Sequence, residues 1–113
     1  MNNIAKLPNG SRAVISIEKL LGYCLNPEHP SGKHKAKVFA SALGITSKNV
    51  EDLRELIVRA AIEGEVAQQT STQFGQLWKV DWAVPSYDQI ILRTLWETTS
   101  ASPLPRLISA FIK

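Results

Sequence analysis

The residues best suited to chemistry lie in one short stretch, 29–37, with the sequence HPSGKHKAK. The pattern predicts the start of a helix capped by Ser31, yet its first turn carries lysines and a histidine and no acid. The positive end of a helix dipole favours carboxylates by roughly 0.3–1 kcal/mol per charge, so cations stand there at a cost. Free backbone N–H groups at a helix start, combined with lysines, suit an anion such as phosphate. We therefore expect an anion site here; the alternative is a solvated basic face.

Helical geometry separates the three lysines of this stretch. At roughly 100° per residue, Lys35 falls in the middle of the apolar arc of the helix, which is formed by Val38, Phe39, Ala42 and Leu43. Because a charge on a core-facing stripe needs a partner, we expect its ammonium to reach a carboxylate, a carbonyl or a bound anion near the helix start. Lys33 and Lys37 point the opposite way, either as ordinary solvated lysines or as outer contacts to a substrate.

The two histidines carry different expectations. His34 lies at the edge of the apolar arc, and its neighbouring lysines favour the neutral imidazole, which can accept a proton. It is therefore a candidate general base or acid. His29 precedes the helix beside Pro30 and is either structural or a second acid. Two histidines without carboxylates at ligand spacing predict no metal site, and the chain has no phosphate-binding loop or dinucleotide motif. We expect no cofactor.

Three residues of the second half could contact a phosphate group or a base. Arg93 and Arg106 are candidates for phosphate contacts, since guanidinium groups bind phosphate in a fork geometry. Trp96 is a candidate stacking platform for a base. The other two tryptophans share a strand face with valines, which favours core packing for that face.

Ser109 lies in the last apolar segment, where Leu107 and Phe111 are expected to flank it on one strand face. Its hydroxyl is either a strand filler or a directed hydrogen-bond donor. Cys24, the one cysteine of the chain, lies on an apolar helix face, and a buried structural thiol is favoured over a nucleophile.

The elements that must position these residues follow from the hydrophobic period. Apolar residues at helical spacing predict three helices, over residues 16–26, 32–43 and 49–63. After Gly64 the period changes to two and predicts four strands, over residues 65–72, 76–85, 89–100 and 105–113, with a hairpin at Phe74-Gly75. The sequence thus predicts an α+β fold of three N-terminal helices followed by a four-stranded antiparallel sheet. Helices can cover only one face of such a sheet, which leaves the other open to solvent or a ligand.

Length and charge limit the remaining choices. The chain has 113 residues, typical of one domain over 1–113, with an irregular lead-in over 1–12. Its net charge is +3, and the first 48 residues hold seven Lys or Arg and only two Glu, so the positive charge gathers around the 29–37 stretch. This favours an anionic partner. There is no apolar run of membrane-spanning length and no signal-peptide core, so we expect a cytoplasmic protein without membrane contact.

Three stretches together resemble a bacterial family catalogued as domain of unknown function number 6883. They are KLLGYCLNPEHPSGKHKAKVFASALGI, TQFGQLWKV and ILRTLWETTSASPLPRLISAFI, and the resemblance runs from about Val14 to Ile112. Its recognisable parts are Gly-x-x-Lys-Ala at Gly32–Ala36, Phe74-Gly75, Trp96 and Pro105-Arg106-Leu107. The family often continues the last element with Val-Thr-Ala-Tyr, where this chain has Ile-Ser-Ala-Phe, so a hydroxyl is kept at 109 and the phenol is lost at 111.

The family is similar in layout to small ribonuclease toxins of the barnase–EndoU–colicin–RelE group. The resemblance implies RNA cleavage without a metal, in which a base takes the proton of a ribose 2′-OH and cations stabilise the phosphorane charge. Carried over, His34 is base or acid, Lys35 and Arg106 hold phosphate and Ser109 donates a hydrogen bond. RNA and a small acidic immunity or antitoxin protein are the implied partners. The alternative is a non-catalytic interaction module or a nucleic-acid-binding domain.

Overall fold

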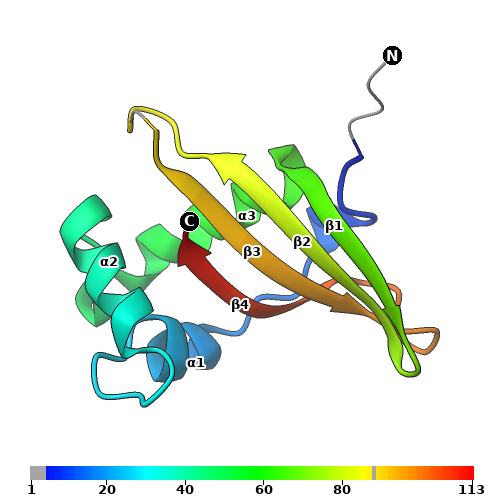
Figure 1. Ribbon diagram of the computed structural model, residues 1–113, viewed down its shortest axis with the longest axis horizontal. Helices are drawn as coiled ribbons and strands as arrows, with labels where there is room; N and C mark the ends of the chain where they lie inside the picture. Colours follow the sequence, from blue (N-terminus) through cyan, green and yellow to red (C-terminus); the bar gives the residue numbers. More distant parts are fainter. Residues whose placement is uncertain (1–4, 88) are drawn as a thin grey trace.

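The first half of the chain is helical and the second half forms one antiparallel sheet (Figure 1). The computed structural model describes residues 5–87 and 89–113. The helical elements are a 3₁₀ turn η1 (Gly10–Arg12), α1 (Ile17–Lys19), a π-helical turn η2 (Leu20–Cys24), α2 (Lys33–Leu43), a 3₁₀ turn η3 (Ser47–Asn49) and α3 (Val50–Glu63). The strands are β1 (Glu65–Thr72), β2 (Gly75–Ala83), β3 (Ile91–Thr98) and β4 (Arg106–Ile112), in the spatial order β1-β2-β3-β4. The predicted α+β class with three main helical segments and a four-stranded antiparallel sheet is confirmed.

The sheet has one buried face and one open face, as the alternation of β2 and β3 predicts. Trp78, Val80 and Trp82 pair with Trp96, Thr94 and Leu92 across β2 and β3, and α3 lies behind this face (Figure 1). With Phe39, Leu53 and Ile57 from the helices, these residues form the core. The intervening positions, among them Leu77, Lys79, Asp81, Arg93 and Leu95, belong to the open face because side chains alternate along a strand.

Strand β4 contains a bulge that changes which face its side chains reach. Leu95 pairs with Ser109 and Trp96 pairs with Leu107, which leaves Ile108 as an extra residue. Paired residues share a face, so Leu107 lies on the core face while Ser109 lies on the open face. The expectation that Leu107 flanks Ser109 on one face is therefore wrong, because strict alternation fails at a bulge.

The helix predicted over 16–26 begins as expected but changes its winding. The Ser16 hydroxyl accepts the N–H of Lys19, as a cap should, and the segment then continues as a π turn, in which the Leu25 N–H donates to the Leu20 carbonyl over 2.8 Å. The buried Cys24 ends this turn, and burial raises the pKa of its thiol. Both observations agree with the structural role favoured for this cysteine.

The start of α2 is capped by a residue that the sequence did not single out for this role. His29 Nδ1 accepts the N–H groups of Ser31 and Gly32, each at 3.0 Å, and the His29 carbonyl accepts the N–H of Lys33. The Ser31 cap is therefore wrong: an imidazole occupies the place where a hydroxyl was expected. These three amides are consequently not free for the anion site expected at this helix start.

Gly32 lets the start of α2 seat directly against η2. A Cβ atom built at Gly32 would lie 2.3 Å from the Tyr23 carbonyl oxygen, closer than side-chain carbons approach backbone oxygens. The His29 ring packs edge-on against the Tyr23 ring, with centroids 4.8 Å apart. The glycine of the Gly-x-x-Lys-Ala element thus brings the first turn of α2 onto Tyr23.

The lead-in is partly tied to the body. Residues 1–4 of the predicted irregular segment lie outside the described residues, whereas Leu7 is buried and Asn9 initiates the η1 turn in a left-handed conformation. Val14 forms a parallel bridge with Arg106 at the free edge of β4. Within the described ranges, no helix has the length and hydropathy needed to cross a membrane.

We expect Gly32→Ala to destabilise the protein by about 1–3 kcal/mol, the usual cost of overpacking, because the new methyl group meets the Tyr23 backbone. Gly22→Ala is the matched control, since a Cβ there meets nothing within 4 Å. It should be neutral or stabilising by up to about 1 kcal/mol, as for Gly→Ala inside a helix. Urea unfolding of both variants measures the difference, and equal midpoints would contradict the close approach.

Candidate functional site

The ammonium of Lys35 sits among two hydroxyls and two aromatic rings. Its Nζ donates to Tyr23 Oη at 2.5 Å and to Ser109 Oγ at 3.3 Å, and it lies 4.6 Å and 5.1 Å from the ring centroids of Tyr23 and Phe111. Ser109 is buried and the other three side chains are half-buried. We call these four residues, Tyr23, Lys35, Ser109 and Phe111, the Lys35 cluster.

Three elements assemble the Lys35 cluster at the β4 edge of the sheet. Tyr23 comes from η2, Lys35 from the first turn of α2, and Ser109 and Phe111 from alternate positions of β4. Lys35 faces the protein, as its place on the apolar arc predicted. Its expected partner was a carboxylate, a carbonyl or an anion. Among the described residues the neighbouring elements supply neutral hydroxyls and ring faces, so the carboxylate and carbonyl alternatives are wrong, while the anion stays a prediction.

No carboxylate neutralises this ammonium within the described part of the chain. The ion pairs there join Arg59 to Glu63, and Arg93 and Lys113 to Asp81. Ring faces attract a cation through their quadrupole, by about 0.5–2 kcal/mol, which offsets some of the cost of partial burial without cancelling the charge. The Lys35 cluster therefore carries a net positive charge.

The hydrogen bonds of the cluster leave donors free. Both hydroxyls accept from the same ammonium, so the proton of each points elsewhere, and no acceptor for it occurs among the described residues. Lys35 has three N–H donors and uses two of them. One ammonium N–H and two O–H groups thus converge, an arrangement that suits a negatively charged oxygen.

His34 serves a different surface from Lys35. It lines a groove of about 490 Å³ with Lys33 and Lys37, together with Leu25, Pro27, Ala36, Ala40, Thr46 and Ser47. We call this the α2 groove. Consecutive helical residues project about 100° apart, which is why His34 is not brought into the Lys35 cluster although it is the next residue. Lys33 and Lys37 lie opposite Lys35, as predicted from the helical wheel.

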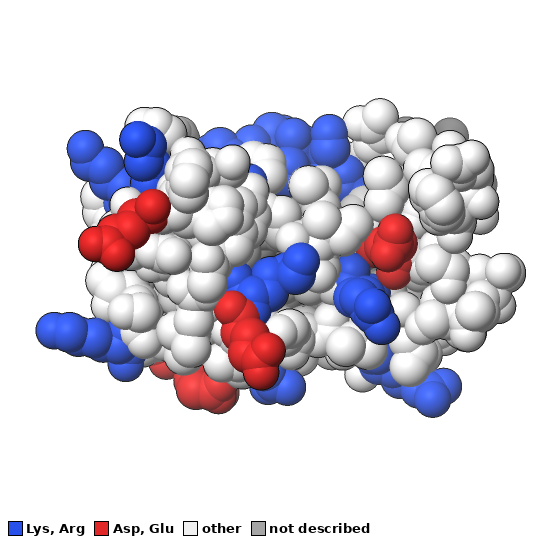
Figure 2. Space-filling model, turned by 90° about the horizontal axis from the view of Figure 1, so that it is seen from below, with Lys and Arg blue, Asp and Glu red and all other residues white. Residues whose placement is uncertain are grey.

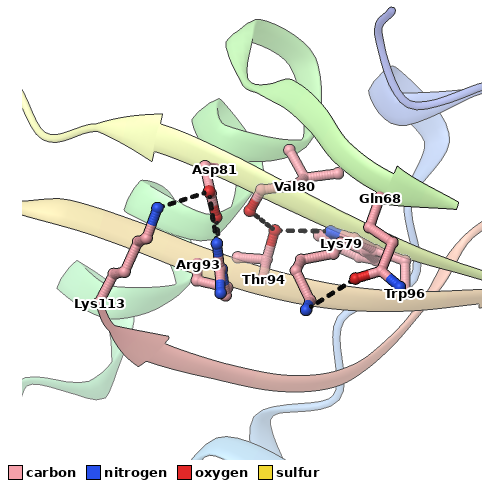
Figure 3. A network of polar contacts seen from close by, with 8 residues as sticks. All are labelled: Gln68, Lys79, Val80, Asp81, Arg93, Thr94, Trp96 and Lys113. Carbon is pink, nitrogen blue, oxygen red and sulfur yellow. Dashed lines mark hydrogen bonds and ion pairs between the residues drawn. The ribbon is translucent and has the colours of Figure 1, made fainter.

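Arg93 is engaged in an ion pair on the open face of the sheet (Figure 3). Its Nε and a terminal nitrogen bind the two carboxylate oxygens of Asp81 at 2.7 Å and 2.8 Å, and Lys113 approaches the same carboxylate at 3.4 Å. The hydrogen bonds from Arg93 hold the pKa of Asp81 below its ordinary value. A substrate phosphate contact by Arg93 would have to compete with this carboxylate.

Trp96 is enclosed in the core. It is fully buried, and its Nε1 donates to Thr94 Oγ1 at 2.7 Å, while that hydroxyl donates to the Val80 carbonyl (Figure 3). The ring therefore offers no face to an incoming base, in contrast to the stacking role expected from the sequence. The tryptophan is needed to fill the space between the sheet and the helices.

Arg106 shares a strand with Ser109 but lies outside the cluster. It is exposed, begins β4 and pairs with Glu97 of β3. Three residues along a strand span at most about 10 Å, so Arg106 lies within that distance of Ser109 along the backbone. Of the four residues expected to be catalytic, the structure thus joins Lys35 and Ser109 directly and places Arg106 nearby on the same strand.

Sequence reasoning missed Tyr23 as a member of the cluster. Its contact with Lys35 spans twelve residues and depends on how α2 turns back onto η2. The spacing of Gly32 and Lys35 could have indicated such a contact. A glycine lets another segment of the chain approach the helix closely, and a lysine one turn later on the same side must then contact that segment. No group of three or more metal-binding side chains gathers within residues 5–87 and 89–113.

The fold and the cluster define a small α+β domain with an uncompensated cation at the edge of its sheet. The chain belongs to the family described as Domain of unknown function (DUF6883), whose model matches residues 6–113. Among solved structures it is similar to a chain of the contact-dependent growth inhibition toxin–immunity protein complex from Klebsiella pneumoniae 342. The TM-score is 0.65 at 14% identity, over 93% of this chain and 97% of that chain, which shows a shared fold. A search of curated proteins finds no match.

The Asp81–Arg93 pair predicts how stability depends on pH. Because the folded state lowers the pKa of Asp81, the carboxylate stabilises the fold above its ordinary pKa and loses this contribution as pH falls through the lowered value. We expect Asp81→Asn to lower the free energy of unfolding by about 1–3 kcal/mol near neutral pH. The difference in this free energy between variant and wild type should shrink below about pH 4. Urea unfolding across this range tests it. Glu97→Gln removes a carboxylate that has no ion pair among the described residues. Its free energy of unfolding should therefore differ less from that of wild type.

Proposed function

We propose that this chain is an RNA-cleaving toxin domain with the Lys35 cluster as its active centre and an immunity protein as its partner. The observation that carries the proposal is the half-buried ammonium of Lys35, whose partners among the described residues are hydroxyls and ring faces. The fold shared with a chain of a contact-dependent growth inhibition toxin–immunity protein complex supports a role in a toxin–immunity pair.

The free donors of the cluster would bind a non-bridging oxygen of a phosphodiester. Lys35 supplies charge, while Tyr23 and Ser109 supply O–H donors that its ammonium orients. Negative charge on phosphate oxygens grows when the 2′-oxygen attacks, so preorganised donors stabilise the transition state more than the substrate. These groups all belong to the chain itself, and the proposed mechanism uses no cofactor.

Proton transfer is assigned to Tyr23 in place of His34. A general acid or base must come within hydrogen-bond reach of the group that it serves, and Tyr23 is in the cluster whereas His34 lines the α2 groove. As the O2′–P bond forms and the P–O5′ bond breaks, the 2′-OH proton passes to a non-bridging phosphate oxygen. The phenol gives its own proton to the leaving 5′-oxygen and recovers one from that phosphate oxygen. Arg106 is proposed to contact a neighbouring phosphate from its exposed position on β4.

The open sheet face offers a path for the rest of the RNA. Lys79, Arg93 and Lys113 lie on this face with Asp81 between the last two (Figure 3). In Figure 2, a group of basic side chains lies along the upper edge of the molecule. This edge is the side that faces the viewer in Figure 1. Asp81 offsets one of these three charges, so this basic strip keeps a net positive charge that suits a polyanion. The cytoplasm is where we propose that it meets RNA.

We expect the purified protein to cleave RNA in the presence of a chelator, and Lys35→Met to lower the rate about 10²–10³-fold, the usual effect of removing one charge-stabilising donor. Lys37→Met is the matched control, because it removes the same charge from the opposite side of α2. Thermal unfolding should show that both variants fold. Equal rates for the two variants, or no cleavage by the wild type, would contradict the proposal.

A non-catalytic interaction module is the second candidate, and the α2 groove favours it. Lys33, His34 and Lys37 line this groove together with apolar and hydroxyl side chains, and no acid lines it. Basic side chains above an apolar floor complement an acidic, apolar segment of a partner protein.

A small acidic protein encoded next to this chain is the partner with which the second candidate is tested. We expect Lys33→Glu/Lys37→Glu to weaken its binding at least tenfold at low salt, since each buried like-charge contact costs on the order of 1 kcal/mol or more. Isothermal titration measures the affinity, with Arg54→Glu as a control for net charge on a different helix. If both charge-reversal variants bind alike, the α2 groove is not the docking surface.

A further inference from the structure

The bulge in β4 aims an extra side chain at the open face, next to the Lys35 cluster. Ser109 pairs with Leu95 and Leu107 with Trp96, so Ile108 stands between them without a partner on β3. Bulges redirect side chains and are frequent beside functional sites. Here the consequence is that Ile108 adjoins Ser109 on the face of the sheet opposite the core, where Lys35 of α2 covers Ser109 while Ile108 stays half-buried.

Ile108 forms one wall of a hollow of about 300 Å³ in that open face. Leu77 and Leu95 form further apolar walls, Trp78 and the buried Trp96 complete the apolar lining, and Gln68, Thr70 and Lys79 supply the polar rim. The volume is at the lower end of small-molecule sites, which span roughly 300–1,000 Å³. Its size, apolar walls and polar rim therefore suit one mostly apolar group with polar edges.

The hollow and the Lys35 cluster are contiguous. Leu95 lines the hollow and pairs directly with Ser109, and directly paired residues have Cβ atoms about 4.5–5.5 Å apart. Ile108 is joined to Ser109 by a peptide bond. A nucleotide could therefore occupy both sites at once, with its phosphate at the Lys35 cluster and its base in the hollow.

The rim of the hollow retains hydrogen-bonding capacity. Gln68 accepts from Lys79 at 3.1 Å through Oε1 (Figure 3). It also donates to Thr70 at 3.4 Å through Nε2. An amide has two N–H donors and two acceptor lone pairs, so one of each stays available. Single-stranded bases are read in this way, held between apolar side chains and hydrogen-bonded at their edges.

We propose that this hollow is a nucleobase pocket, which makes cleavage depend on the base adjacent to the scissile phosphate. The proposal rests on the function proposed above and adds its substrate specificity. Gln68 reads the base edge, while Leu77, Leu95 and Ile108 hold its faces. An apolar side chain of a protein partner is the competing occupant, and the experiment separates the two.

The test maps cleavage sites in a random-sequence RNA pool for wild type and two matched variants. We expect wild type to favour one base, or one pair of bases, beside the cut. Gln68→Ala should reduce that preference roughly 3- to 10-fold, the effect of losing one base-edge hydrogen bond. Gln69→Ala removes the neighbouring amide, which faces the other way and binds Gln76, and should leave the preference unchanged. Leu77→Ala should raise KM for the favoured sequence with kcat nearly unchanged.

The outcomes distinguish the two proposals. If wild type cleaves RNA with no base preference, or Gln68→Ala and Gln69→Ala keep the wild-type preference, the nucleobase pocket is overturned and the nuclease proposal stands. If wild type cleaves no RNA, both proposals fall. If Gln68→Ala or Leu77→Ala alters binding of the partner protein but not the cleavage pattern, the hollow is a protein-docking site instead.

Discussion

The close seating of α2 on η2 is the constraint on which the candidate site depends. Gly32 leaves room for the Tyr23 carbonyl, and the His29 ring binds the amides of residues 31 and 32 while it packs against the Tyr23 ring. Lys35 lies one turn further along α2, and its side chain therefore extends past the Tyr23 phenol to Ser109 of β4. A methyl group at residue 32 would separate the two elements, and with them the cluster.

Arg93 and Lys35 are cations whose charges are balanced in different ways. Arg93 is matched by a carboxylate in a two-point ion pair, which stabilises the sheet but leaves little attraction for another anion. Lys35 is surrounded by neutral oxygens and ring faces, which do not cancel its charge. Its positive electrostatic potential therefore extends beyond the cluster and can attract an anion. This contrast is why we place anion binding at Lys35 rather than at Arg93, although a sequence shows both only as basic residues near apolar ones.

The β4 bulge joins the Lys35 cluster to the open face. Without it, strict alternation would place Ile108 on the core side when Ser109 faces outward. With it, an apolar wall and a hydroxyl donor stand side by side. A strand that only closed the sheet would not need this irregularity, so the bulge connects the fold to the proposed chemistry.

The local patterns of the sequence by themselves determined the secondary-structure elements. Apolar residues at helical spacing predicted the helices, and alternating apolar residues predicted all four strands. Such periods arise from the geometry of a single helix or strand, without any contact to other segments. They also predicted that Lys35 faces inward while Lys33 and Lys37 face outward. Only the tertiary structure decided what Lys35 meets, that His29 caps α2, that Trp96 is enclosed and that His34 looks into a separate groove. Each of these depends on contacts between segments brought together by packing, or on a bulge or π turn that shifts the register by one residue. A one-dimensional period cannot record such contacts, since it describes each element only relative to its own axis.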